Sequence, residues 1–164
     1  MSSGPCSFTI SSHLAASAGR VWAHASDFKE INREFWPLLR MTYPAGKAQI
    51  TPESFPLGEV AFRSWLLLFG VIPVEYDDIT LVELVPGQHF SEVSRMLAIR
   101  EWRHRRSVTP EGSGCILADE IAFTPRLRMM GPVQVWLCRI VFARRHRRLR
   151  RLFGGVERRD PDRA

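Results

Sequence analysis

The chain has 164 residues, 45% hydrophobic and 24% charged, a composition typical of a folded globular protein with a single core. The formal net charge of +6 comes largely from the last third, so it indicates a local basic face rather than a general affinity for nucleic acid. Three widely spaced cysteines without a C-x-x-C pair argue against a disulfide framework or a zinc site and favour a reducing cytoplasm.

The apolar runs and the ends of the chain argue against a secreted or membrane-spanning protein. Residues 1–5 lack the basic segment and apolar core of a signal peptide. The longest apolar runs, 65–74 and 133–143, are too short to span a bilayer, and Arg139 interrupts the second. We therefore predict a cytoplasmic protein with one domain over residues 1–155, followed by a polar tail at 156–164 that we expect to be disordered.

The first part of the chain predicts a strand followed by two short helices. Residues 7–13 alternate in polarity, as expected of a half-buried strand. Ser17 is a suitable N-cap for a first helix, and Asp27 for a second. The second helix should end at Trp36, because a residue that precedes a proline avoids the helical conformation.

After these helices the apolar residues recur with a period of two, which predicts strands. The segments with this alternation are 39–43, 59–69, 76–84, 90–96, 101–109 and 115–124. Short turns containing glycine and proline separate them, which favours an antiparallel meander.

A long helix is predicted to close the chain between Pro132, which suits a first helical turn, and Gly154, which suits a C-terminal stop. Its apolar stripe consists of Val135, Cys138, Phe142, His146, Leu149 and Phe153. The first half of the helix is apolar nearly all round, so we expect other parts of the protein to cover it. The second half is rich in arginines, which the helix dipole favours at this end.

This order of elements is that of the helix-grip fold, and the chain resembles the SRPBCC superfamily (START-like, birch-pollen-allergen-like), in its polyketide cyclase/dehydrase and lipid transport branch. The residues that carry the resemblance are Arg20–Phe28, Trp102–His104, Gly114–Asp119 and Phe142–Leu149. The resemblance implies an α+β ligand-binding domain in which a curved antiparallel sheet of about six or seven strands wraps around the C-terminal helix and leaves a cavity. Members of the superfamily include carriers, cyclases, hydrolases and receptors, so the fold alone does not decide the chemistry.

The last predicted hairpin determines which polar side chains face that cavity. One register places Trp102, His104, Arg106 and Val108 beside Ile121, Asp119, Leu117 and Cys115. The opposite face is mostly charged, so we expect this set to face inward, with His104 directly opposite Asp119.

His104, Arg106 and Asp119 are then polar groups on an otherwise apolar face, where burial is costly unless they satisfy one another or a ligand. One interpretation is catalytic: His104 and Asp119 transfer a proton and Arg106 stabilises an anion. The other is a structural ion pair. His146 likewise is either a satisfied core histidine or a ligand contact.

A set of mostly apolar side chains is predicted to line the cavity. The strand at 59–69 is apolar on both sides, so one side is assigned to the cavity and the other is a candidate contact for a homodimer. The predicted ligand-binding residues are Trp65, Leu67, Phe69, Tyr76, Trp102, Leu117, Ile121, Met130, Val135, Cys138, Phe142 and His146. Asp77 and Asp78 are adjacent acids without metal-ligand spacing, so we expect no metal. The chain has no nucleotide-binding loop, zinc-protease motif or nucleophile elbow, so we expect no cofactor.

Three functions follow, in this order of preference. The first is binding of a small hydrophobic or aromatic molecule, polyketide- or lipid-like, between the sheet and the helix. The second is a cofactor-independent cyclase, dehydratase or isomerase that uses His104 and Asp119 for proton transfer. The third is interaction of the arginine-rich helix end with RNA or an anionic membrane; nucleic acid is not favoured, because only Phe153 lies near the arginines.

Overall fold

The structure is a computed structural model that describes residues 6–156, so most of the predicted polar tail lies outside the described residues. In chain order the elements are β1 (Cys6–Leu14), α1 (Ala18–Ala25), α2 (Phe28–Phe35), β2 (Leu39–Met41), β3 (Phe62–Leu68), β4 (Ile72–Ile79), β5 (Leu81–Val85), β6 (His89–Met96), β7 (Ile99–Glu111), β8 (Gly114–Pro125), η1 (Arg128–Met130) and α3 (Gly131–Phe153). The predicted strand, two short helices, run of strands and closing helix are all present.

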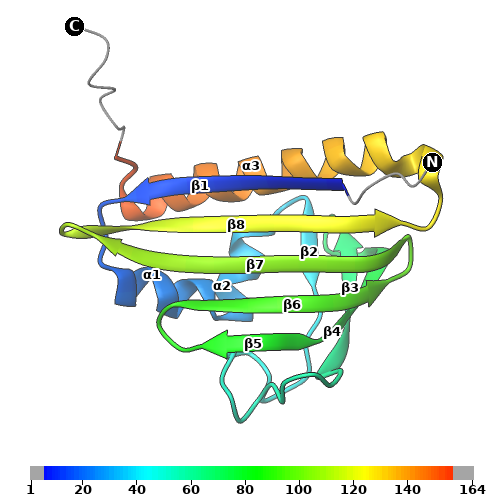
Figure 1. The fold of residues 1–164 in the computed structure, drawn as a ribbon, viewed down its shortest axis with the longest axis horizontal. Coiled ribbons are helices and arrows are strands. Elements are labelled where there is room, and N and C mark those ends of the chain that lie inside the picture. Colours follow the sequence, from blue (N-terminus) through cyan, green and yellow to red (C-terminus); the bar gives the residue numbers. More distant parts are fainter. Residues whose placement is uncertain (1–5, 157–164) are drawn as a thin grey trace, which may run out of the picture.

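The strands form one antiparallel sheet in the order β1-β8-β7-β6-β4-β3-β2, with β5 also paired to β6. The predicted strand at 76–84 is divided between β4 and β5, which pair with successive parts of β6. The interruption lies at Thr80, whose N–H donates to the Ser94 hydroxyl at 3.2 Å instead of to a strand carbonyl. The sheet curls, so that its two ends and α3 enclose one face, as in the predicted helix-grip fold (Figure 1).

The β7–β8 hairpin has the predicted inward face but not the predicted register. His104 is directly opposite Ile121, and Arg106 is directly opposite Asp119, two residues away from the predicted pairing. The reason is the tight loop: β7 and β8 are joined by Gly112 and Ser113, and Gly112 has a φ of 58°. A glycine at the first position suits a two-residue hairpin turn. This turn is centred one residue later than predicted, which shifts each pair by two and leaves the faces unchanged.

The helix α3 lies beside β1 and also contacts β8 and α2 (Figure 1). Phe142, His146, Leu149 and Phe153 of the predicted stripe are buried, and Val135 and Cys138 are half-buried. The expectation that the first half of the helix is covered all round is wrong. Because α3 is packed on one side only, Trp136 and other apolar residues on its outer side are exposed. Within residues 6–156, no helix combines the length and hydropathy needed to cross a membrane.

Three apolar clusters fill the space between the sheet and the helices. The first, at the C-terminal end of α3, contains Leu14, Val21, Val108, Leu117, Leu149 and Phe153 among others. The second, around α2, contains Phe28, Ile31, Phe35, Phe55, Ile79 and Phe90 among others. The third, which we call the Trp102 cluster, contains Met96, Ile99, Trp102, Ile121, Phe123 and Phe142, with Cys6, Phe8, Ile10, Leu66, Val135 and Cys138 packed against it.

Candidate functional site

A row of buried polar side chains crosses the inner face of the sheet between these clusters. The strands contribute Ser12, Ser64, Asp77, Glu92, Ser94, His104, Arg106 and Asp119, and the helices contribute His24, Glu34, Arg145 and His146. We call this set the polar belt. Each of its members is at most 8% exposed. Buried polar groups on this scale are tolerated only where they satisfy one another, so the pairing within the belt determines its chemistry.

Asp119 is the central acceptor of the polar belt. Its Oδ1 accepts hydrogen bonds from His104 Nε2 at 2.7 Å and Arg106 Nε at 2.8 Å, and its Oδ2 accepts from Arg106 and His146 Nε2, both at 2.9 Å. Burial alone would raise the pKa of Asp119, but Arg106, and then the two histidines, hold it well below its usual value. A carboxylate offers about four lone-pair sites, and these four bonds occupy them. Asp119 is therefore a fixed anion without a free position for a substrate proton.

Arg106 is shared between Asp119 and Glu34 of α2. Its two terminal nitrogens each donate to one Glu34 carboxylate oxygen at 3.1 Å, and Arg145 Nε of α3 donates to the same carboxylate at 2.8 Å. Burial opposes the ionisation of Glu34, but the two guanidinium charges outweigh it and lower its pKa. One buried carboxylate thus ties α2 and α3 to the sheet.

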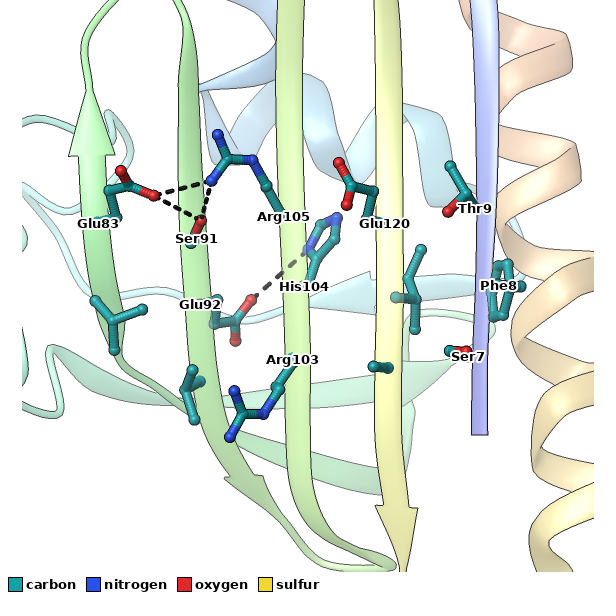
Figure 2. Close-up of a pocket in the computed structure, with 14 residues that line it drawn as sticks. Ser7, Phe8, Thr9, Glu83, Ser91, Glu92, Arg103, His104, Arg105 and Glu120 are labelled. Atoms are coloured by element: carbon teal, nitrogen blue, oxygen red, sulfur yellow. Dashed lines mark hydrogen bonds and ion pairs between the residues drawn. The ribbon is translucent and has the colours of Figure 1, made fainter. Parts of the chain in front are cut away.

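His104 lies between two carboxylates. Its Nε2 is bonded to Asp119, and its Nδ1 is 3.7 Å from Glu92 Oε2 (Figure 2). Burial disfavours the imidazolium, but the hydrogen bonds and charges of Asp119 and Glu92 prevail and raise the pKa of His104. An imidazolium with a carboxylate on each side has no free nitrogen with which to act as a base. The positive charge of His104 instead neutralises the Glu92 carboxylate beside it.

His146 is a neutral histidine satisfied within the core. Burial is the largest cause that lowers its pKa, and the charges of Arg106 and Arg145 act in the same direction. Since the Asp119 carboxylate only accepts, Nε2 of His146 carries the ring proton, and Nδ1 accepts from the Ser12 hydroxyl at 2.8 Å. This is one of the two interpretations that the sequence left open.

The end of the polar belt on β3 and β4 has hydrogen-bonding capacity that no group among residues 6–156 satisfies. Ser64 Oγ and Asp77 Oδ1 are buried without a partner, and the two residues lie directly opposite each other in the sheet. Burial, followed by the charge and hydrogen bond of Glu92, raises the pKa of Asp77 well above its usual range. Burial also acts to raise the pKa of Glu92, but His104 lowers it. A protonated Asp77 donates its proton toward Glu92, so its free Oδ1 accepts, and together with the Ser64 hydroxyl it offers one acceptor and one donor to a polar group of a bound molecule.

This unsatisfied end borders the Trp102 cluster. Asp77 pairs with Met96 of that cluster, and Leu66 follows Ser64 by two residues on the same face of β3. The Trp102 ring centroid is 5.9 Å from that of Phe123 and 6.4 Å from that of Phe142. Leu66 of β3 and Val135 and Cys138 of α3, which pack against the cluster, are only half-buried. A few polar groups beside apolar and aromatic surface is the usual composition of a small-molecule site.

The structure brings together only part of the predicted ligand-binding set. The members found in the Trp102 cluster are Trp102, Ile121, Val135, Cys138 and Phe142. His146 belongs to the polar belt, and Leu117 lies in the cluster at the other end of α3. Phe69, in the β3–β4 loop, and Met130, in η1, are both exposed.

The predicted ligand-binding residues of β3 and β4 lie on the outward face of the sheet. Trp65 is 41% exposed and pairs with Tyr76, and Leu67 pairs with the exposed Arg40. The inward face instead carries Ser64 and Leu66. Both faces of β3 contain large apolar residues, so alternation alone could not decide which one is buried, and the small polar Ser64 made the inner face look like the outer one.

Sequence reasoning predicted three buried polar groups, and the structure adds Glu34, Asp77, Glu92, Ser94, Arg145 and others. The sequence did contain a signal for Glu92 and Ser94. Both lie between Phe90 and Met96 at steps of two residues, which places all four side chains on the same face of β6. Glu34 follows Ile31 by three residues on the apolar side of α2. An acidic residue within an apolar stripe is therefore the sequence feature that would have predicted these buried polar groups.

Two surface depressions lie outside the space between α3 and the sheet. The larger is on the convex side of the sheet, away from the helices, across β1, β8, β7, β6 and β5 (Figure 2). Some of its charged groups pair with each other, as Arg105 does with Glu83 at 2.9 Å. The smaller surrounds Arg95 and Arg126 near a sheet end. Among residues 6–156, no cluster of three or more histidine, cysteine, aspartate or glutamate side chains is arranged to hold a metal.

Comparison with known proteins supports the fold. Residues 12–153 match the profile of the family described as domain of unknown function DUF8410, and no curated protein matches the chain in sequence. Among solved structures, CV1439 from Chromobacterium violaceum is similar with a TM-score of 0.67 and 15% identity, over 91% of this chain and 98% of that one. A START superfamily protein from Mycobacterium smegmatis is similar with a TM-score of 0.59 and 12% identity, over 92% and 99%. Ara h 8.0201 is similar with a TM-score of 0.57 and 8% identity, over 89% and 98%. These likenesses establish the SRPBCC/START-like fold that the sequence predicted.

Proposed function

We propose that this chain, which belongs to the DUF8410 family, binds a small hydrophobic or aromatic molecule, polyketide- or lipid-like, at the Trp102 cluster, with a polar group of the ligand at Ser64 and Asp77. The observation that carries the proposal is the pair of unsatisfied buried atoms, Ser64 Oγ and Asp77 Oδ1. They lie beside the Trp102 cluster, whose surrounding residues are only partly buried. Buried polar atoms without a partner are rare in folded proteins, and a polar group of a bound ligand or an ordered water usually explains them.

The two parts of this site have different roles. Burial of ligand carbon against Trp102, Leu66 and Phe142 provides most of the affinity, at roughly 25 cal/mol per Å² of apolar surface. The Ser64 hydroxyl and Asp77 Oδ1 select among apolar ligands, because a ligand without a polar group leaves both atoms unpaired, which costs roughly 1–3 kcal/mol each. We therefore expect a ligand with a carbonyl or hydroxyl oxygen on an apolar body.

The test compares 2-naphthol with naphthalene by isothermal titration calorimetry. The wild type should bind 2-naphthol more tightly, and Ser64→Ala should reduce that preference. Leu66→Trp should fill the site and abolish binding. The matched control is Trp65→Phe, a change on the outward face of the same strand, which should leave binding intact. Unchanged binding by a folded Leu66→Trp variant would place the ligand elsewhere.

A second candidate function, a cofactor-independent cyclase, dehydratase or isomerase, is favoured by one observation: the pKa values of neighbouring Asp77 and Glu92 are shifted in opposite directions. In this version Asp77 exchanges a proton with the ligand, which it accepts at Oδ1 while its own proton passes to Glu92. The predicted proton-transfer pair, His104 and Asp119, with Arg106, then acts indirectly by keeping Glu92 ionised, since the hydrogen-bonding positions of Asp119 are occupied.

This second function is tested by incubating the protein with a linear poly-β-ketone thioester and detecting cyclised or dehydrated product by mass spectrometry. An enzyme should lose turnover in Asp77→Asn while it still binds 2-naphthol. His104→Gln should shift the pH profile of turnover, because it removes the charge that holds Glu92 ionised. Absence of product with binding retained would leave the carrier function.

A further inference from the structure

The outer side of α3 exposes a contiguous apolar face. Val133, Trp136, Leu137 and Ile140 follow one another at steps of three and four residues, which places them on one side of the helix, opposite the buried stripe of Phe142. They are between 42% and 61% exposed, so within residues 6–156 these side chains are left largely uncovered. A contiguous exposed apolar face of this kind marks an interaction surface.

The loop before the helix extends this apolar face. Leu127 is 65% exposed and Met129 in η1 is 84% exposed. Both immediately precede the first turn of α3 in the chain. The apolar region is therefore the N-terminal half of α3 together with the segment that leads into it.

The same side of α3 becomes cationic in its C-terminal half. Further steps of three and four residues from Ile140 lead to Arg144, Arg147 and Arg151. Arg148 and Arg150 bond to the fold, at the Arg33 carbonyl and the Ser12 hydroxyl. Within residues 6–156, by contrast, Arg147 and Arg151 are exposed and have no ion-pair or hydrogen-bond partner. The helix itself contains no acidic residue.

We propose that this face of α3 docks on an anionic phospholipid bilayer. Met129, Trp136 and Leu137 would enter the boundary between headgroups and acyl chains, and Arg147 and Arg151 would contact the phosphates. A bilayer surface presents an apolar layer directly beneath an anionic one, which matches an amphipathic helix whose polar positions are basic. The indole of Trp136 suits this boundary, and arginine side chains can extend to the phosphates while their stems stay in contact with the apolar layer.

Charge decides between the bilayer and other occupants. A second copy docked symmetrically through the same face would bring the same arginines into the interface, with no acidic residue on either α3 to neutralise them. Single-stranded RNA would need aromatic side chains beside the arginines for base stacking, and Phe153, which is close to them in sequence, is buried. An anionic lipid surface complements both halves of the face.

The experiment is co-sedimentation of the full chain with vesicles. Binding is expected to equimolar phosphatidylcholine and phosphatidylglycerol, to weaken as salt is added, and to be far weaker with phosphatidylcholine alone. Each arginine near an anionic surface contributes roughly fivefold to partitioning, so Arg147→Gln with Arg151→Gln should weaken binding about twentyfold. Trp136→Ser with Leu137→Ser should abolish it. Quenching of tryptophan fluorescence by brominated lipid should be reduced in Trp136→Phe.

Matched controls lie elsewhere on the surface. Arg95→Gln with Arg100→Gln removes two exposed arginines from the sheet, and Val82→Ser with Leu57→Ser removes two exposed apolar residues. All four control changes should leave vesicle binding unchanged. Equal loss in the controls would overturn the assignment to α3. So would a stable dimer, detected by light scattering, that Trp136→Ser with Leu137→Ser dissociates, or binding of an RNA oligonucleotide without binding of anionic vesicles.

Discussion

Two buried aspartates on the inner face of the sheet have pKa values shifted in opposite directions. Asp119 is surrounded by donors and cations, and its pKa is held well below its usual value despite burial. Asp77 is 4% exposed, faces the Glu92 carboxylate, and is protonated because burial and that neighbour raise its pKa. Type and burial are the same, so the partners alone make one residue a fixed anion and the other a neutral donor.

Replacement of each aspartate by asparagine should therefore have opposite consequences for the free energy of unfolding. Asp119→Asn leaves Arg106 and His104 with one anion fewer, and breaking a buried charge pair in this way costs roughly 3–5 kcal/mol. Asp77→Asn substitutes a neutral group for a neutral group and should change stability by less than about 1 kcal/mol at neutral pH. Urea unfolding measures both. The exposed pair of Arg63 and Asp78, joined at 2.7 Å, is the control, and Asp78→Asn should cost less than about 1 kcal/mol.

The pH dependence of stability should carry the signature of His104. Its pKa in the folded state lies above the ordinary value of 6.5, because Asp119 and Glu92 outweigh burial. The stabilisation that this group provides is complete below about pH 6.5 and is lost as the pH rises through the folded-state pKa. Unfolding free energy should therefore decline on the alkaline side, and His104→Gln should flatten that decline. Identical slopes in the two proteins would show that the imidazolium is not the stabilising form.

Asp119 should produce the opposite limb of the same curve. Its folded-state pKa lies below the ordinary value of 3.8, so its contribution is present above that pH and is lost as the pH falls through the folded-state value. In His104→Gln this acid limb should persist, since Arg106 still faces Asp119. Stability curves of the wild type, His104→Gln and Asp119→Asn, measured by urea unfolding between acidic and alkaline pH, separate the two contributions.

At the scale of single elements, periodicity predicted which face each strand buries but not the pairing or the choice between two apolar faces. The inward set of β7 and β8 was correct because alternation is independent of register. The pairing of His104 depended on the centre of the Gly112–Ser113 loop, and a one-residue difference there moved Asp119 opposite Arg106. The His104–Asp119 hydrogen bond forms nonetheless, because their side chains meet diagonally on one face.

The helix α3 illustrates the same limit. Its buried stripe follows from the three- and four-residue steps. Its outer side is also apolar, and the sequence does not indicate whether protein or a lipid bilayer covers that side. A pair of substitutions on this helix should separate the two sides. Phe142→Ala, in the Trp102 cluster, should lower the free energy of unfolding by roughly 3–5 kcal/mol, and Ile140→Ala, on the outer side, by less than about 1 kcal/mol. Thermal denaturation without vesicles is the measurement, and a large loss in Ile140→Ala would mean that protein covers this side.

At the scale of the whole molecule, the polar belt explains how α2 and α3 are held on the sheet while the Trp102 cluster can adapt to a ligand. Arg106 joins Glu34 of α2 to Asp119 of the sheet through bidentate contacts, and such contacts fix geometry as well as distance. The helix α3 is joined to the same two carboxylates by single hydrogen bonds from Arg145 and His146. The Trp102 cluster, at the other end of the belt, is covered along α3 by one buried residue, Phe142, and by the half-buried Val135 and Cys138. Residues distant in sequence create this division, which is why the sequence predicted the His104 region and not Glu34 or Ser64.

The interior site and the outer face of α3 are formed by different residues, so their functions should separate cleanly. Leu66→Trp should abolish binding of 2-naphthol and leave anionic vesicle binding unchanged, because Leu66 lies on the inner face of β3. Neutralising Arg147 and Arg151 should weaken vesicle binding and leave 2-naphthol binding nearly unchanged, since a solvated cationic face contributes little to a buried apolar site. Both ligands are measured on both variants, with circular dichroism to confirm folding. Loss of vesicle binding in Leu66→Trp would instead mean that occupancy of the interior controls the outer face, and that the two sites are coupled through α3.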